Sequence, residues 1–155
     1  EALQPEFKEY ANQIVSNAKA LAKAMKDNGF ILQGGGTENH LILANVKDSF
    51  GIDGKFFERA LDMVGLTLNA NAVPGDKGGA FRPSGVRLGT PAVTTRGMKE
   101  AEMKQIADWM KQVMEICQKA KTEEVLEESE FKSELDKIHQ EVIALSKQFK
   151  VPGLN

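Results

Sequence analysis

Cysteine and histidine are scarce in this sequence, and their scarcity excludes several kinds of site. The only cysteine, Cys117, allows no internal disulfide and favours a reducing, cytoplasmic compartment. It lies on an apolar helix face, so we interpret it as a small buried hydrophobe rather than a nucleophile. The two histidines, His40 and His139, have no clustered partner at ligand spacing. We therefore expect no metal site.

Long apolar runs and blocks of like charge are also missing. No apolar run approaches the length of a membrane span, and no signal peptide is visible. The net charge of −2 gives no reason to expect a nucleic-acid or membrane partner. What is present is an ordinary balance of apolar (41%) and charged (27%) residues, which is typical of one folded domain at this length of 155 residues.

The first residues raise the question of what surrounds this chain. It opens without methionine, on "EALQPEFKEY", and enters a helical pattern almost at once. We expect it to be a piece of a longer polypeptide. What the chain can do and what its parent does are therefore separate questions.

Three segments carry apolar residues at spacings of three and four, which predicts amphipathic helices. The first covers roughly residues 5–28, and the second begins near residue 98 with a stripe over 106–116. The third has apolar positions over 131–149. Between the last two, the acidic stretch "KTEEVLEESE" is predicted to be a solvated connection.

Short β-rich runs alternate with these helices. They are "FILQ", "HLILANV" (40–46), "LTLNA" and "GVRLGT" (85–90), and "SFGIDGKFFERALDMVG" is predicted to lead from a loop into a helix. The resulting order αββαββ predicts an α+β fold, with a short, mostly antiparallel sheet packed with helices.

The longest irregular stretch is "NAVPGDKGGAFRPSGVRLGTPA", residues 71–92. It does not match a phosphate-binding loop, because its lysine precedes the glycines and no helix follows directly. "GGGTEN" does not match a dinucleotide fingerprint either, because it opens no helix. So long a loop without structure of its own is unusual unless it is functional or disordered.

Arg87, in "GVRLG", is the charged residue of most interest. Strand alternation places Val86 and Leu88 on one face and Arg87 on the other, where its guanidinium needs water or an anion. Two interpretations remain open at this point. Arg87 pairs with a surface Asp or Glu, or it binds the carboxylate of a ligand, which its planar fork suits.

Three segments carry a family resemblance. "GGTENHLILANV", "LNANAVPGD" and "FRPSGVRLGTPAVTTRGMKEAEM" closely resemble the C-terminal part of serine hydroxymethyltransferase, over roughly residues 1–118 and compatibly through the last helix. The resemblance implies the small C-terminal domain of the aspartate aminotransferase-like fold of pyridoxal-phosphate enzymes. Residues 1–155 would be that single domain, with 1–28 as its leading helix and the large cofactor-binding domain absent.

The resemblance also implies roles for individual residues. Arg87 matches the arginine that pairs with the substrate carboxylate, and Asn71 matches an asparagine that reaches the folate. Gly79, Ala80 and Phe81 match a segment that lines the folate site in bacterial members, although those members commonly show Ser-Pro-Phe there.

The implied parent interconverts serine and glycine with tetrahydrofolate and 5,10-methylenetetrahydrofolate. Pyridoxal 5′-phosphate would be bound by the missing large domain, in a cytoplasmic homodimer or homotetramer. The family's cofactor-linked lysine belongs to that domain, and Lys77 is no substitute. We therefore expect no catalytic residue in this chain, and no activity from it alone.

Two alternatives accompany this interpretation. Another enzyme of the same fold, such as an aminotransferase or threonine aldolase, would use a small-domain arginine but would not need the Asn71 loop. A non-catalytic module would instead use the helix over 131–149 to pack on a partner.

Overall fold

The structure, a computed structural model, describes residues 4–79 and 81–153, and it confirms the α+β class. Its strands are β1 (Ile31–Leu32), β2 (Leu41–Asn45), β3 (Asn69–Asn71) and β4 (Gly85–Gly89). Its helices are α1 (Pro5–Asp27), α2 (Val46–Phe50), α3 (Gly54–Met63), α4 (Pro91–Thr95), α5 (Glu100–Ala120), α6 (Glu123–Leu126) and α7 (Ser129–Ser146), with a 3₁₀ turn at Gln33–Gly35.

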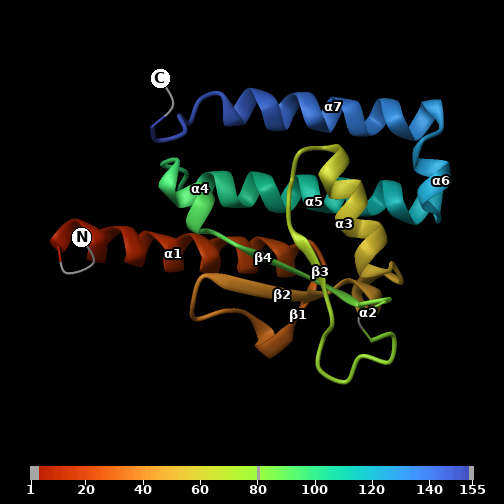
Figure 1. The fold of residues 1–155 in the computed structure, drawn as a ribbon, viewed down its shortest axis with the longest axis horizontal. Helices are drawn as coiled ribbons and strands as arrows, with labels where there is room; N and C mark the ends of the chain where they lie inside the picture. Colours follow the sequence, from red (N-terminus) through yellow and green to blue (C-terminus); the bar gives the residue numbers. More distant parts are fainter. Residues whose placement is uncertain (1–3, 80, 154–155) are drawn as a thin grey trace.

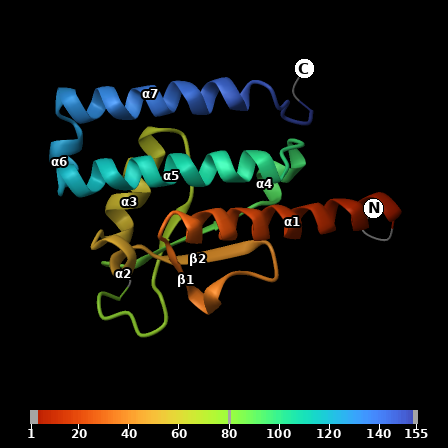
Figure 2. The same cartoon turned by 180° about the vertical axis from the view of Figure 1, so that it is seen from behind.

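The four strands form one antiparallel sheet in the order β1-β2-β4-β3. Helices α1 and α5 lie side by side behind this sheet in Figure 1 and in front of it in Figure 2. Ile42, Ala44 and Val86 are buried at the side of the sheet that joins the main core. The sheet is thus packed with helices, as the sequence predicts.

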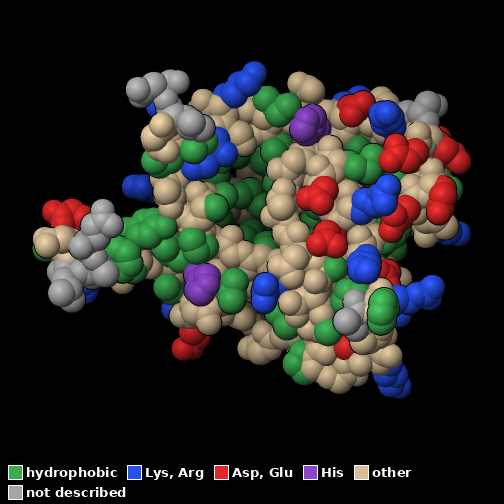
Figure 3. Space-filling view, viewed as in Figure 1, with side chains coloured by type: hydrophobic (Ala, Val, Ile, Leu, Met, Phe, Trp, Pro, Cys, Tyr) green, Lys and Arg blue, Asp and Glu red, His purple; other side chains and the backbone are tan. Residues whose placement is uncertain are grey.

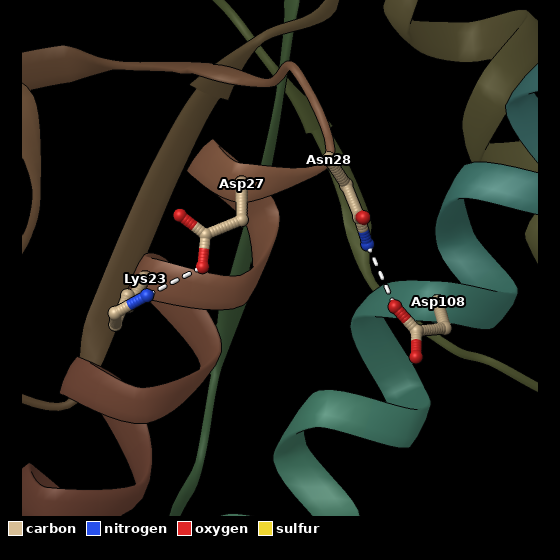
Figure 4. A network of polar contacts seen from close by, with 4 residues as sticks. All are labelled: Lys23, Asp27, Asn28 and Asp108. Carbon is tan, nitrogen blue, oxygen red and sulfur yellow. Dashed lines mark hydrogen bonds and ion pairs between the residues drawn. The ribbon is translucent and has the colours of Figure 1, made fainter.

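Helix α1 confirms the first predicted helix over its described residues. Pro5 stands in the first turn, where its missing N–H is not needed, and Ala18, Leu21 and Met25 are buried. At the other end, the Asn28 side chain donates a 3.0 Å hydrogen bond to Asp108 of α5, whereas Lys23 and Asp27 pair on the exposed surface (Figure 4). The end of α1 is therefore tied to α5.

Helix α5 lies at the centre of the core, and α7 packs on it. Leu135, Ile138 and Val142 of α7 are buried, and Trp109 of α5 donates a 2.7 Å hydrogen bond to Glu141. Cys117 is fully buried, and burial raises the pKa of its thiol to about 12, which confirms its interpretation as a hydrophobe.

The predicted connection "KTEEVLEESE" is exposed at most of its described residues, but it is not wholly irregular or solvated. Part of it forms α6, and Leu126 is only 1% exposed. The pattern did not reveal this helix because one turn offers too few positions for a periodic signal.

Other boundaries also differ. Helices α2 and α4 were not predicted, and α2 includes Ser49 and Phe50 of the expected loop. Strand β3 begins at Asn69, three residues after the start of "LTLNA". Strand β2 ends at Asn45, because the Asn45 side chain accepts a hydrogen bond from the Asp48 N–H and so caps the start of α2.

Candidate functional site

Arg87 lies at the middle of β4, between β2 and β3. The register places Leu43 opposite it on β2 and Asn69 opposite it on β3. Val86 is fully buried and Leu88 packs partly against the core, whereas Arg87 is exposed. The predicted alternation is confirmed, and Arg87 stands on the outward face of the sheet.

The guanidinium of Arg87 has no anionic partner in the part of the chain that the structure describes. Among residues 4–79 and 81–153, Arg87 forms no ion pair and no side-chain hydrogen bond. The first of the two interpretations, a structural pair with a surface carboxylate, therefore finds no support in the described residues. Five N–H donors in a planar fork remain available to an anion.

Asn71 shares this face. It pairs with Gly85, two positions along from the Asn69–Arg87 pair, so it is a diagonal neighbour of Arg87 at about 7–8 Å by ordinary sheet geometry. Its side-chain amide donates a 2.7 Å hydrogen bond to the Ala72 carbonyl. The sheet thus brings together two of the residues that the sequence singles out.

Asn69 is a candidate that the sequence analysis missed. It lies directly opposite Arg87 and is half-buried, and its amide donates to the Ala70 carbonyl at 3.1 Å. Strand alternation of Asn69 with Asn71 was the available signal, but the predicted strand ended at Ala70 and left Asn71 in the loop. We name Arg87, Asn69 and Asn71 the Arg87 face.

Gly85 fixes how the loop returns to this face. A Cβ at Gly85 would lie 2.6 Å from Val73 Cγ1 and 2.7 Å from the Ala44 carbonyl oxygen. Gly54, at the start of α3, approaches the same strand, because a Cβ there would collide with the Gly85 carbonyl oxygen. Its N–H donates to the carbonyl of Pro83, just before β4, at 2.9 Å. Glycine is required here for close approach of backbones rather than for a left-handed conformation.

Asp76 joins the middle of the loop to its end. Its carboxylate accepts hydrogen bonds from the Ser84 N–H at 2.7 Å, the Gly78 N–H at 3.0 Å and the Ser84 hydroxyl at 2.8 Å. The backbone N–H groups of Ser84 and Gly78 are the main cause that lowers the pKa of Asp76 to about 2. This carboxylate therefore helps to position the strand that carries Arg87.

The predicted folate segment 79–81 is not part of this constellation. Phe81 is 87% exposed and lines a surface hollow with residues such as Ile52 and Lys121, and Gly79 is exposed. No strand pairing or hydrogen bond among the described residues joins Gly79 or Phe81 to Arg87. Ala80 lies outside the described residues.

Other kinds of chemistry find little support in the described residues. No group of three His, Cys, Asp or Glu there could hold a metal ion. Every lysine there, Lys77 included, is exposed or half-exposed, so none offers the desolvated amine that a covalently linked pyridoxal needs.

Where residues are described, no helix has the length and apolarity of a membrane span. The Arg87 face is suited to binding an anion.

Comparison with known proteins gives one consistent result. A sequence profile of the Serine hydroxymethyltransferase family matches residues 1–110. Serine hydroxymethyltransferase from Acidobacterium capsulatum is 47% identical over 99% of this chain and 33% of its own length. The enzyme from Acidothermus cellulolyticus is 49% identical over 100% of this chain and 35% of its own length. The enzyme from Coxiella burnetii is 50% identical over 74% of this chain and 27% of its own length. The chain thus spans about a third of the length of these curated relatives.

Proposed function

Because the chain belongs to the serine hydroxymethyltransferase family, we propose that it is the C-terminal domain of an enzyme that interconverts serine and glycine with tetrahydrofolate and 5,10-methylenetetrahydrofolate. Residues 1–155 form that one small domain, and the part of the relatives outside the match supplies the large domain. The observation that carries this proposal is the exposed Arg87 in the middle of β4, which has no ion-pair partner among residues 4–79 and 81–153.

Arg87 binds the carboxylate of serine or glycine in this proposal. A guanidinium donates two parallel hydrogen bonds to a carboxylate, which fixes the orientation of the amino acid as well as its position. Orientation determines which bond of the substrate is ready to break, so Arg87 acts by positioning rather than by proton transfer.

The Arg87 face also contacts the folate. Asn71, at the edge of this face, donates to the cosubstrate, and the segment of Gly79, Ala80 and Phe81 lines the same ligand. The diagonal arrangement of Asn71 and Arg87 supports adjacent sites for the two substrates. The exposed ring of Phe81 supports a contact with a ligand or with the large domain.

Pyridoxal 5′-phosphate, which supplies the electron sink of this chemistry, belongs to the large domain. The described residues of this chain do not fit it, since none of their lysines is buried. The active enzyme is a cytoplasmic homodimer or homotetramer in this proposal, and this chain by itself is inactive.

The alternatives predict different behaviour. An aminotransferase or threonine aldolase would work without folate. A helical interaction module is disfavoured because the stripe of α7 is already covered, with Leu135, Ile138 and Val142 buried within this chain.

The test uses a longer protein that joins this chain to the remaining two thirds seen in the relatives. We expect that protein to cleave serine only slowly without tetrahydrofolate and rapidly with it. Asn71→Ala is expected to weaken the folate dependence, whereas Asn12→Ala, an exposed change on α1, leaves it intact. Serine cleavage at the same rate with and without tetrahydrofolate would refute the proposal.

A further inference from the structure

A second feature of the molecule is an apolar recess on the helix side of β4. It lies between Leu88, the α3–β3 connection and the end of α7, and its volume is about 170 Å³. Figure 3 shows a hollow with hydrophobic side chains at its floor. Leu88 rather than Arg87 lines it, so the recess is distinct from the Arg87 face.

The walls of this recess are incompletely covered hydrophobic side chains. Protein interiors are normally close-packed, so half-buried aliphatic residues gathered around one recess indicate room for a further apolar group. Those lining it are Leu66, Leu68, Leu88, Ile106 and Leu145, and the buried side chain of Trp109 completes the wall.

The volume indicates the size of that group. In another protein, an engineered apolar cavity of about 150 Å³ stays free of water and binds benzene. A recess of about 170 Å³ therefore has room for a phenyl-sized group. Burial of that ring against aliphatic side chains supplies the favourable free energy.

Arg96 gives the recess a charged wall. Its Nη2 donates to the carbonyls of Ser146 at 2.5 Å and Phe149 at 2.8 Å, and its Nε donates to Phe149 at 3.3 Å. The two N–H groups on Nη1 have no hydrogen-bond partner, and no carboxylate pairs with Arg96, among residues 4–79 and 81–153.

The charge of Arg96 is not fully balanced by these contacts. The carbonyls of Ser146, at the end of α7, and of Phe149, just after it, carry only partial negative charges. The remaining donors suit a carboxylate, since a guanidinium recognises that group by charge and by geometry.

We propose that this recess binds a small carboxylate that carries a phenyl-sized apolar group. The ring lies among Leu68, Leu88 and Ile106, and the carboxylate meets Nη1 of Arg96. The site does not depend on the Arg87 face, so Arg87→Lys leaves its affinity unchanged.

The test uses two probes of nearly equal shape, phenylacetate and phenylacetamide. Trp109 is the only tryptophan in the chain and lines the recess, so its fluorescence reports occupancy. We expect saturable changes with both probes and an affinity about tenfold higher for phenylacetate, because only the carboxylate forms a charge-assisted bond. Added salt weakens the binding of phenylacetate and leaves that of phenylacetamide unchanged.

Three variants sharpen the result. Leu68→Phe fills the recess and abolishes the binding of both probes, whereas Leu41→Phe, on the exposed surface of β2, changes neither. Arg96→Gln makes the two affinities equal while phenylacetamide still binds, which also shows that the recess remains folded. The proposal is overturned if neither probe gives a saturable change, if Leu68→Phe binds like the wild type, or if the wild type does not distinguish the probes.

Discussion

At the scale of single residues, Asp76 shows how one carboxylate organises an irregular loop. It accepts hydrogen bonds from the middle and from the end of that loop, at Gly78 and Ser84. The segment between β3 and β4 thus follows a defined path, although its described residues form no helix or strand.

The lowered pKa of Asp76 predicts a pH dependence of stability. A carboxylate whose pKa is lower in the folded state contributes stability above its unfolded pKa, near 3.8, and loses that contribution as pH falls toward 2. We expect the melting temperature of Asp76→Asn to lie below that of the wild type at pH 5, with the difference shrinking as pH falls from about 4 to 2.

Asp136→Asn is the matched control, because Asp136 is exposed on α7. It is expected to show no comparable change with pH. A constant difference between wild type and Asp76→Asn over pH 2–5 would contradict the role given to Asp76.

The sequence predicted the position of single residues correctly where the alternation of a strand was enough to place them. Arg87 was expected on the outward face and lies there. Asp76 was missed because its partners depend on the path of the loop, which local spacing does not encode. Asn69 was missed because the predicted strand ended at Ala70, which separated Asn69 from Asn71.

At the scale of elements, Asn17 holds α1 against α4 and the turn after it. It is fully buried, and its amide donates to Thr94 Oγ1 at 2.8 Å and to the Met98 carbonyl at 2.9 Å. Gln13 in turn donates to its carbonyl oxygen at 3.0 Å. This polar contact fixes how α1 meets the segment that follows β4.

Asn17→Ala is expected to reduce the free energy of unfolding by about 2 kcal/mol, because it leaves a buried carbonyl without its donor. The exposed Asn12→Ala on the same helix is the control, and it is expected to change stability by less than about 0.5 kcal/mol. Urea denaturation measures both values. Equal stability of the two variants would show that the buried contact makes no net contribution to the free energy of unfolding.

Gly85→Ala tests the close approach at the start of β4. The added Cβ would meet Val73 and the Ala44 carbonyl at less than 3 Å, so we expect a loss of about 1–3 kcal/mol in the free energy of unfolding. Gly36→Ala is the control, since nothing lies within 4 Å of its Cβ position. If Gly85→Ala proved as stable as Gly36→Ala, the strand would not need glycine there.

The long helices were predictable because α1, α5 and α7 repeat their apolar spacing over several turns. The short helices were not. Helix α2 depends on a cap from Asn45, and α6 depends on the burial of Leu126, which are tertiary features of a single turn. The sequence predicted a short, mostly antiparallel sheet. It did not predict which residues pair across the strands, because that register depends on the folded chain.

At the scale of the whole molecule, the chain has a core of its own but only part of the proposed machinery. We therefore expect the 155-residue chain to melt cooperatively, as followed by circular dichroism. With serine, tetrahydrofolate and pyridoxal phosphate added, we expect no serine cleavage above the uncatalysed rate, because none of the described lysines is buried. Robust cleavage by this chain alone would contradict the division of roles between domains.

The central claim is that Arg87 receives the carboxylate of the amino-acid substrate, and Arg87→Lys tests it in the longer protein. Lysine keeps the charge but loses the two-pronged fit to a carboxylate. Arg82→Lys, an exposed change in the loop, is the matched control.

The decisive measurement is the serine affinity of the wild type, Arg87→Lys and Arg82→Lys side by side. We expect Arg87→Lys to lose about 1.5–3 kcal/mol, or roughly one to two orders of magnitude in affinity, while pyridoxal phosphate still binds and Arg82→Lys matches the wild type. If Arg87→Lys binds serine as tightly as the wild type, Arg87 does not hold the substrate and the account of this face is wrong.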